Sequence, residues 1–192
     1  MNFTNHQITD LLSLCQQGEQ GAQMEVYNRY YKAMYNTSLR IVKHEAEAED
    51  IMQESFLSAF TKLDSYKGEA SFGSWLKRIV VNNSLNAYNK SKRLDETSID
   101  DHLYKIEDDA AGVAEMDLSS VRAQEVVNAM SELKDNYRQS LSLHLIEGYD
   151  YEEMSEIMNV SYANCRTMVS RAKDSLRKLL NNNEKGTYRS SI

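Results

Sequence analysis

Apolar side chains recur every three or four positions through most of the first 94 residues, a pattern that predicts amphipathic helices. Four segments carry it: roughly 8–18, 26–42, 48–68 and 72–92, with Gly18 and Gly68 marking two of the ends. The apolar positions, helix by helix, are Ile8, Leu11, Leu12 and Cys15; Val26, Tyr27, Tyr30, Tyr31, Met34, Leu39 and Val42; Ala48, Ile51, Met52, Phe56, Ala59, Phe60 and Leu63; and Phe72, Trp75, Leu76, Ile79 and Val80. Because the joints between the segments are short, we expect a compact helical bundle.

The periodicity breaks down between residues 95 and 120, where scattered apolar residues lie among nine acidic residues and a single lysine. Such a composition is typical of a segment that cannot bury a core, and the stretch is longer than most loops in compact domains. We therefore expect a flexible acidic linker over 95–120. It divides the chain into an N-terminal domain, 1–94, and a C-terminal domain, 121–183, and a disordered tail is expected over 184–192.

Helical patterning resumes at Val121 and leads into the layout of a helix-turn-helix. Asp150 with Glu153 three positions later predicts the capped start of a short helix, and Gly148 just before it predicts the end of the preceding one. A tight turn over 159–161 then places Ser161 as the N-cap of the last helix. That helix is expected to bury Cys165, Val169, Ala172, Leu176, Leu179 and Leu180. A short helix, a three-residue turn and a longer helix with a basic exposed side suit DNA binding.

Composition narrows the class of protein. The 192 residues are 41% apolar, contain no proline, and include no run near the ~18 apolar residues that a membrane span needs. The first residues lack the layout of a secretory signal, and the only cysteines, Cys15 and Cys165, give no disulfide framework. We therefore expect an all-α protein of two small helical domains that works in the cytoplasm.

The last helix carries the first candidate binding surface. Residues 160–180 include five basic residues and one acid, although the whole chain has a net charge of −7. Side chains in the first turns of such a helix reach base edges in the major groove, and later basic residues suit phosphates. An ordinary amphipathic helix with a solvated basic face is the alternative. The candidate DNA-binding residues here are Asn164, Arg166, Thr167, Ser170, Arg171 and Lys173.

The fourth helix carries a second basic surface, because residues 77–93 include five basic residues and no acid. A polar stripe at four-residue spacing consists of Arg78, Asn82, Asn86 and Lys90. Asparagine can pair with adenine or with the edge of an unstacked base, and nearby aromatic rings could stack on such bases. Of these rings, Tyr66 lies in a loop and is the better stacking candidate, whereas Phe72 and Trp75 fall at core spacing.

The start of the third helix is acidic. It holds five carboxylates and no base, over Glu45, Glu47, Glu49, Asp50 and Glu54, with Gln53 among them. Acidic residues at a helix N-terminus stabilise the helix dipole, which is one explanation. Asp50, Gln53 and Glu54 share one side, however, and an acidic face between two basic elements also suits docking onto a basic protein surface.

Nothing in the sequence resembles an enzyme site. The four histidines are scattered without metal-ligand spacing, and no phosphate-binding loop or nucleophile elbow is present. We therefore expect no catalytic residue, no metal, no cofactor and no small-molecule substrate.

Taken in order, the three surfaces resemble the extracytoplasmic-function (ECF) sigma factors of the sigma-70 superfamily, which are bacterial transcription initiation factors. Residues 48–60 (AEDIMQESFLSAF) resemble that family's polymerase-binding helix. Residues 66–93 (YKGEASFGSWLKRIVVNNSLNAYNKSKR) resemble its promoter-melting and −10-reading segment, and 148–180 resembles its −35-reading helix-turn-helix. One departure lies at Ala163-Asn164-Cys165, where many members have Gly-Thr-Val, and another at Met168, where a second basic residue often follows.

The resemblance implies a role for each surface. It puts Asp50, Gln53 and Glu54 on the clamp of the largest polymerase subunit, and the C-terminal domain on the flap of the second subunit. It puts Tyr66 at a flipped −10 base, with Trp75, Lys77, Arg78, Asn82, Asn86 and Lys90 along the same DNA. In the last helix, Arg166 and Arg171 match basic positions of the family's −35-reading helix. The linker would follow a basic channel of the polymerase, although a simple solvated tether explains it equally well. Control by a membrane-anchored anti-sigma factor is common in the family.

Two other functions fit parts of the pattern. A conventional repressor or activator would need a ligand pocket or a dimer seam within residues 1–94 and would bind duplex DNA unaided. A helical adaptor of the anti-sigma type would leave the basic stripe of the fourth helix unexplained. When added to core RNA polymerase, a sigma factor would give promoter-specific transcripts, whereas a repressor, an activator or an adaptor would give none.

Overall fold

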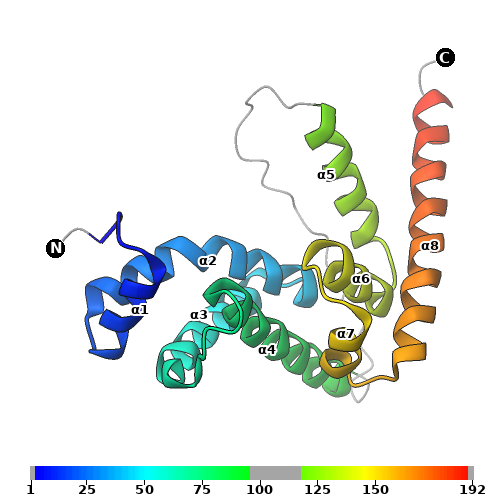
Figure 1. The fold of residues 1–192 in the computed structure, drawn as a ribbon. Helices are drawn as coiled ribbons and strands as arrows, with labels where there is room; N and C mark the ends of the chain where they lie inside the picture. The colour runs from blue at the N-terminus through cyan, green and yellow to red at the C-terminus, as the bar shows by residue number, and fades with distance from the viewer. Residues whose placement is uncertain (1–2, 96–117, 190–192) are drawn as a thin grey trace. The chain divides into compact units, whose positions relative to one another are not determined.

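The computed structural model describes residues 3–95 and 118–189, and every regular element in these ranges is a helix (Figure 1). The all-α prediction is confirmed. The elements are α1 (Ile8–Gln16), α2 (Gln20–Val42), α3 (Glu45–Thr61), the 3₁₀ turn η1 (Leu63–Ser65), α4 (Phe72–Asp95), α5 (Leu118–Ser131), α6 (Asp135–Leu141), the π-helical segment η2 (Ser142–Ile146), α7 (Tyr151–Met158) and α8 (Tyr162–Arg189). The chain forms two compact units, Met1–His102 and Leu103–Ile192.

In the N-terminal unit, α2 is the central helix, because α1, α3 and α4 all pack against it. Each helix contributes most of the apolar face that its sequence predicts, but Tyr31 of α2, expected on that face, is exposed. Ala22 and Val26 of α2, together with Leu76 and Val80 of α4, are completely buried. The rest of this core comes from Leu11, Leu12, Cys15, Met34, Met52, Phe56, Ala59, Leu63 and Phe72.

Small polar side chains line the contact of α4 with α2 and α3. The Ser84 hydroxyl lies 2.7 Å from the Val80 carbonyl oxygen and 2.9 Å from the Ser38 hydroxyl of α2. The preceding residue faces α3 instead, where the Asn83 amide donates to the Ser55 hydroxyl over 3.0 Å. Since serine is small and its hydroxyl also bonds within its own helix, the three backbones can approach closely without an unsatisfied polar group.

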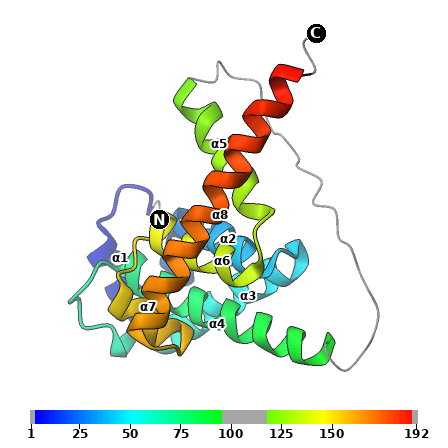
Figure 2. The ribbon, with the colours of Figure 1, turned by 90° about the vertical axis from the view of Figure 1, so that its right-hand side faces the viewer.

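In the C-terminal unit, α8 packs against α5, α6 and α7, and both views show α5 beside α8 (Figures 1 and 2). The completely buried residues include Leu141, Leu143, Met154, Cys165 and Ala172. Burial raises the pKa of the Cys165 thiol above its ordinary value, and raises that of Cys15 in the other unit to about 11. Both thiols are therefore neutral near pH 7 and serve as small apolar core residues.

Local backbone signals set the joint between α7 and its neighbours. Gly148 has a left-handed φ of 82°, which ends the preceding helix. Asp150 then accepts a hydrogen bond from the Glu153 amide over 2.8 Å, and the Glu153 carboxylate accepts one from the Asp150 amide over 2.9 Å. After α7, Asn159 is left-handed and the Ser161 hydroxyl caps α8. The predicted capping box and helix-turn-helix are confirmed.

Some boundaries differ from those that the sequence predicts. Residues 118–120, assigned to the linker, begin α5, whereas 96–117 lie outside the described residues. Residues 184–189, predicted as a disordered tail, continue α8, since no proline interrupts the helix and a single glycine costs only about 1 kcal/mol. The π-helical segment was not predicted. Its i to i−5 bond joins the Glu147 amide to the Ser142 carbonyl over 3.0 Å.

The capping box yields a prediction about local stability. Asp150→Ala removes one of its two hydrogen bonds and should destabilise α7 by about 1 kcal/mol. In hydrogen exchange on the full-length protein, the α7 amides should then exchange about fivefold faster. Asp150→Asn keeps an acceptor at the same place and should exchange like the unaltered protein. Equal protection in all three proteins would show that the box does not stabilise this helix.

Candidate nucleic-acid interface

The outer face of α8 is set by its buried face. Cys165, Val169, Ala172 and Leu176 are buried and lie within one sector of the helix. With about 100° per residue, Thr167 then points away from the core, with Ser170 and Arg171 on either side of it. Arg166 and Lys173 lie along the edge next to Ser170, and Asn164 lies towards the edge next to Arg171. The six candidate residues of α8 are exposed, except that Lys173 is half-buried. The helix therefore presents a polar, mostly basic surface.

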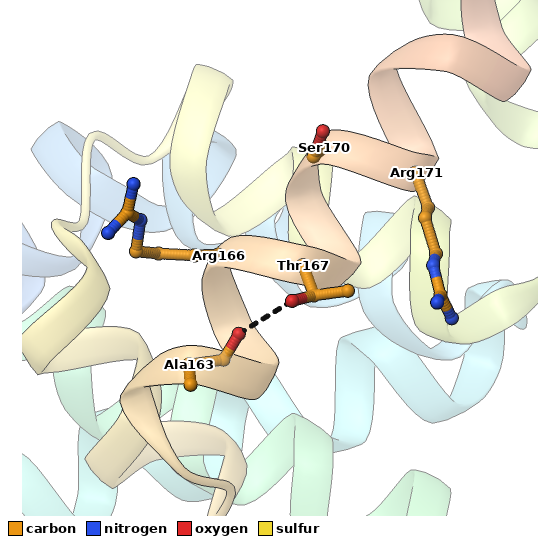
Figure 3. A pocket seen from close by; sticks show the side chains of 5 residues that line it. All are labelled: Ala163, Arg166, Thr167, Ser170 and Arg171. Carbon is orange, nitrogen blue, oxygen red and sulfur yellow. Dashed lines mark hydrogen bonds between the residues drawn. The ribbon is translucent and has the colours of Figure 1, made fainter.

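Part of this surface is an open hollow of about 470 Å³ lined by Ala163, Arg166, Thr167, Ser170 and Arg171. Figure 3 shows Arg166 and Arg171 extending from different sides of α8, with the shorter side chains between them. The Thr167 hydroxyl donates to the Ala163 carbonyl over 2.9 Å, so its oxygen is available to accept a hydrogen bond (Figure 3). Two long basic side chains flanking small polar ones can straddle a groove of DNA.

Arg166 also has a neighbour on its own helix. Its guanidinium lies over the Tyr162 ring, 6.0 Å from the ring centroid. Further along, Arg177 forms an exposed ion pair with Asp174 over 2.7 Å, which a phosphate would have to displace or share. The sequence pattern revealed neither contact, although both partners lie at helical spacing, i to i+4 and i to i+3.

The polar stripe on α4 lies opposite its buried face. Phe72, Leu76, Val80 and Ser84 are buried at four-residue spacing. The stripe Arg78, Asn82, Asn86 and Lys90 has the same spacing, so both rows wind around α4 in parallel and lie on opposite sides where they overlap, over about 9 Å. Asn82, Asn86 and Lys90 are exposed, whereas Lys77 and Arg78 are half-buried.

The aromatic candidates form a cluster at the start of α4. Tyr66, Phe72 and Trp75 lie 5.4 to 5.7 Å from one another, between ring centroids. Phe72 belongs to the core, and the rings of Tyr66 and Trp75 are half-buried against it. The Tyr66 hydroxyl donates to the Ala70 carbonyl over 2.7 Å, which closes the loop before α4. Tyr66 is therefore part of a packed platform and not a ring that projects into solvent.

The acidic candidates lie on the outer face of α3. Asp50, Gln53 and Glu54 are all exposed, while Ala48, Ile51, Met52, Ser55, Phe56 and Ala59 on the other face are buried. Gln53 donates to Glu49 over 3.2 Å. The negative field reaches α2, because Glu45 and Glu49 add to burial in raising the pKa of the Tyr35 hydroxyl.

Sequence reasoning missed one residue on this face. Leu57 follows Gln53 and Glu54 by one helical turn, and 68% of its side-chain surface is exposed. The signal was present, since Leu57 falls outside the apolar periodicity of the helix and cannot reach the core. An exposed leucine beside carboxylates is suited to a protein contact with an apolar centre and a charged rim.

Among residues 3–95 and 118–189, no group of three or more histidine, cysteine or carboxylate side chains could hold a metal ion. Of the helices described there, none is long and apolar enough to span a bilayer.

Comparison with known proteins assigns the two units. Residues 26–94 match the family described as Sigma-70 region 2, and residues 123–176 match Sigma-70, region 4. Two such regions define a bacterial transcription initiation factor of the sigma-70 type.

Relatives narrow the class. The chain is 33% identical over 158 residues to the ECF RNA polymerase sigma factor SigM of Bacillus subtilis, which covers 82% of this chain and 94% of that protein. It is 28% identical over 181 residues to the ECF RNA polymerase sigma-E factor of Salmonella typhimurium, covering 90% and 94%. The chain therefore belongs to the ECF RNA polymerase sigma factors, which direct RNA polymerase to promoters to initiate transcription.

Solved structures share the fold. One is the sigma factor RpoE in complex with the anti-sigma factor NepR from Bartonella quintana, with a TM-score of 0.59 and 21% identity over 82% of this chain and 96% of that one. Another is CnrH in complex with the cytosolic domain of CnrY, with a TM-score of 0.54 and 19% identity over 90% and 96%.

Proposed function

We propose that the three exposed surfaces divide the work of promoter recognition. The N-terminal domain, 1–94, binds the polymerase clamp through Asp50, Gln53 and Glu54. It reads and helps to melt the −10 element through the α4 stripe. The C-terminal domain, 121–183, reads the −35 element through α8. The observation that carries this division is that each surface lies on a helix whose opposite face is buried, so that most of its polar side chains are exposed to solvent, where a partner can reach them.

Binding to the polymerase is what makes the two DNA readers act together. Each domain alone offers a small surface of mixed composition, whereas two sites joined on one partner gain from effective concentration. The acidic linker, 95–120, supports this arrangement, because its charge suits a basic channel that otherwise holds nucleic acid. The flap of the second polymerase subunit is the proposed contact of the C-terminal domain. The protein then works in the cytoplasm, on the nucleoid, through the polymerase.

An anti-sigma factor is a further proposed partner, and in this family such proteins are commonly membrane-anchored. The support comes from the similar fold of RpoE, which was solved with the anti-sigma factor NepR. A partner that covers the outer face of α3 would compete with the polymerase for the same carboxylates and for Leu57.

Charge reversal on α3 tests the polymerase contact. Asp50→Lys with Glu54→Lys should weaken binding to core polymerase at least about tenfold, because two attractive contacts become repulsive. Both side chains are exposed, so the free energy of unfolding should change by less than about 0.5 kcal/mol. The measurement is a native gel titration of core polymerase.

The matched control reverses two exposed acids outside α3. Glu19→Lys with Glu69→Lys changes the net charge equally and should leave holoenzyme formation intact. Equal weakening by both pairs would mean that net charge, and not this face, governs the contact.

The two arginines of α8 test −35 reading. Arg166→Ala and Arg171→Ala should each reduce promoter use without weakening binding to core polymerase. If an arginine holds a guanine through two hydrogen bonds, its loss costs about 1–3 kcal/mol and falls on one base pair. A phosphate contact instead gives an even loss across sequences and a shallower salt dependence. Run-off transcription from a randomised −35 library distinguishes the two, and an unchanged profile for both variants would remove α8 as the reader.

The asparagines of α4 test strand reading. Asn82→Ala and Asn86→Ala replace exposed residues with better helix formers, so the melting temperature should stay the same or rise. Open-complex formation should nevertheless fall, because base-edge hydrogen bonds to the unpaired strand are lost. Permanganate footprinting of the −10 region measures this directly.

A premelted promoter separates reading from melting. On a template with a mismatched −10 bubble, Asn82→Ala should remain defective, whereas Tyr66→Ala should be partly restored. Normal transcription by both asparagine variants from duplex promoters would reduce the stripe to a solvated helix face.

A further inference from the structure

A row of side chains in the C-terminal unit runs from η2 to the reading face of α8. The rings of His144 and Tyr151 stack 4.8 Å apart with 20° between their planes. Tyr151 meets Tyr162 edge to face, with centroids 6.0 Å apart and planes at 86°. The Arg166 guanidinium in turn lies over the ring of Tyr162. Four side chains from three successive elements therefore form one continuous series of contacts.

The far end of this row is fixed to the backbone. The His144 ring is hydrogen-bonded through Nδ1 to the Tyr149 carbonyl over 3.0 Å, and Tyr151 is the first residue of α7, between the two residues of the capping box, Asp150 and Glu153. Because His144 is bonded to the backbone and Tyr151 is held at the start of α7, the Tyr151 ring has a fixed position against Tyr162. The other end of the row, on α8, is accessible to DNA, since 42% of the Tyr162 surface is exposed.

Arg166 gains most from such a support. A guanidinium on a long exposed side chain samples many rotamers, and reading a base requires one orientation of its planar fork. A tyrosine at i−4 offers an aromatic face at the height where the guanidinium lies, and cation–π contact favours that rotamer before DNA arrives. Arg171 lies about 140° away around α8 and cannot use the same ring.

We propose that Tyr162 is a positioning residue that orients Arg166 for base reading through its ring face. This role rests on the proposed function of α8. It assigns a task to an exposed aromatic side chain at the first position of the reading helix, where the core gains little from it.

Three substitutions separate the ring face from bulk. Tyr162→Phe keeps the face and the packing on Tyr151, Tyr162→Met keeps apolar bulk without a π face, and Tyr162→Ala removes both. In run-off transcription from a randomised −35 library with the full-length holoenzyme, the Phe variant should match the unaltered protein. The Met and Ala variants should lose about three- to tenfold in preference at the base pair that Arg166→Ala also affects, and at no other. A Met variant that keeps full preference would overturn the proposal, whatever the folding of the Ala variant.

Double substitutions provide the second arm. If Tyr162 acts through Arg166, Tyr162→Met should cause no further loss in an Arg166→Ala protein, yet its full loss in an Arg171→Ala protein. A loss that persists without Arg166 would mean that Tyr162 contacts DNA or supports the fold, and would contradict the positioning role. If Arg166→Ala loses base preference but shows no coupling to Tyr162→Met, only this inference is refuted and the proposed function of α8 is unaffected. An Arg166→Ala protein with unchanged preference also overturns this inference, because Arg166 then reads no base, whereas the proposed function of α8 fails only if Arg171→Ala leaves the profile unchanged as well.

Discussion

The close contact of α4 with α2 and α3 is the constraint on which the N-terminal unit depends. Ser84 meets Ser38 on one side of the contact, and Asn83 meets Ser55 on the other. These are directional bonds between buried or half-buried groups, so a rotation of α4 about its axis would leave several of them unsatisfied. Fixing this rotation fixes which residues face outward. The position of the polar stripe on α4 is thus decided by residues on the opposite side of the same helix.

A comparable constraint operates in the C-terminal unit through backbone geometry. The π-helical segment, the left-handed Gly148 and the capping box follow one another within a few residues and turn the chain from η2 into α7. The turn at Asn159 and the Ser161 cap then set the start of α8. Buried Cys165 and Val169 decide the rotation of that helix. The direction in which Arg166 points is therefore determined before any DNA is present.

Much of this architecture is legible in the sequence, because it follows from local rules. Apolar periodicity predicts the helices and their buried faces, and cap residues predict the helix-turn-helix. The π-helical segment was not predictable in this way, since its apolar residues fit an α-helix equally well. The extension of α8 was missed because Asn- and Ser-rich composition indicates low apolar content and says little about a helix already nucleated upstream. The Tyr66 platform was missed because the Tyr66–Ala70 bond lies within a loop that no periodicity describes.

Because the inner faces carry the stability, the outer faces can change at little cost to folding. Asp50 and Asn82 are exposed, and substitution at such positions leaves most of the free energy of unfolding intact. A fold of this kind can keep its core while its DNA and protein contacts diverge. This fits the comparison with two relatives, whose sequences are only about 30% identical to this chain although the match covers 94% of each relative's length. In the row from His144 to Arg166, the inner and outer faces are not independent in this way. There the Arg166 side chain is tied through Tyr162 to Tyr151 at the start of α7, so a change in either tyrosine could alter the orientation of Arg166 without disturbing the core.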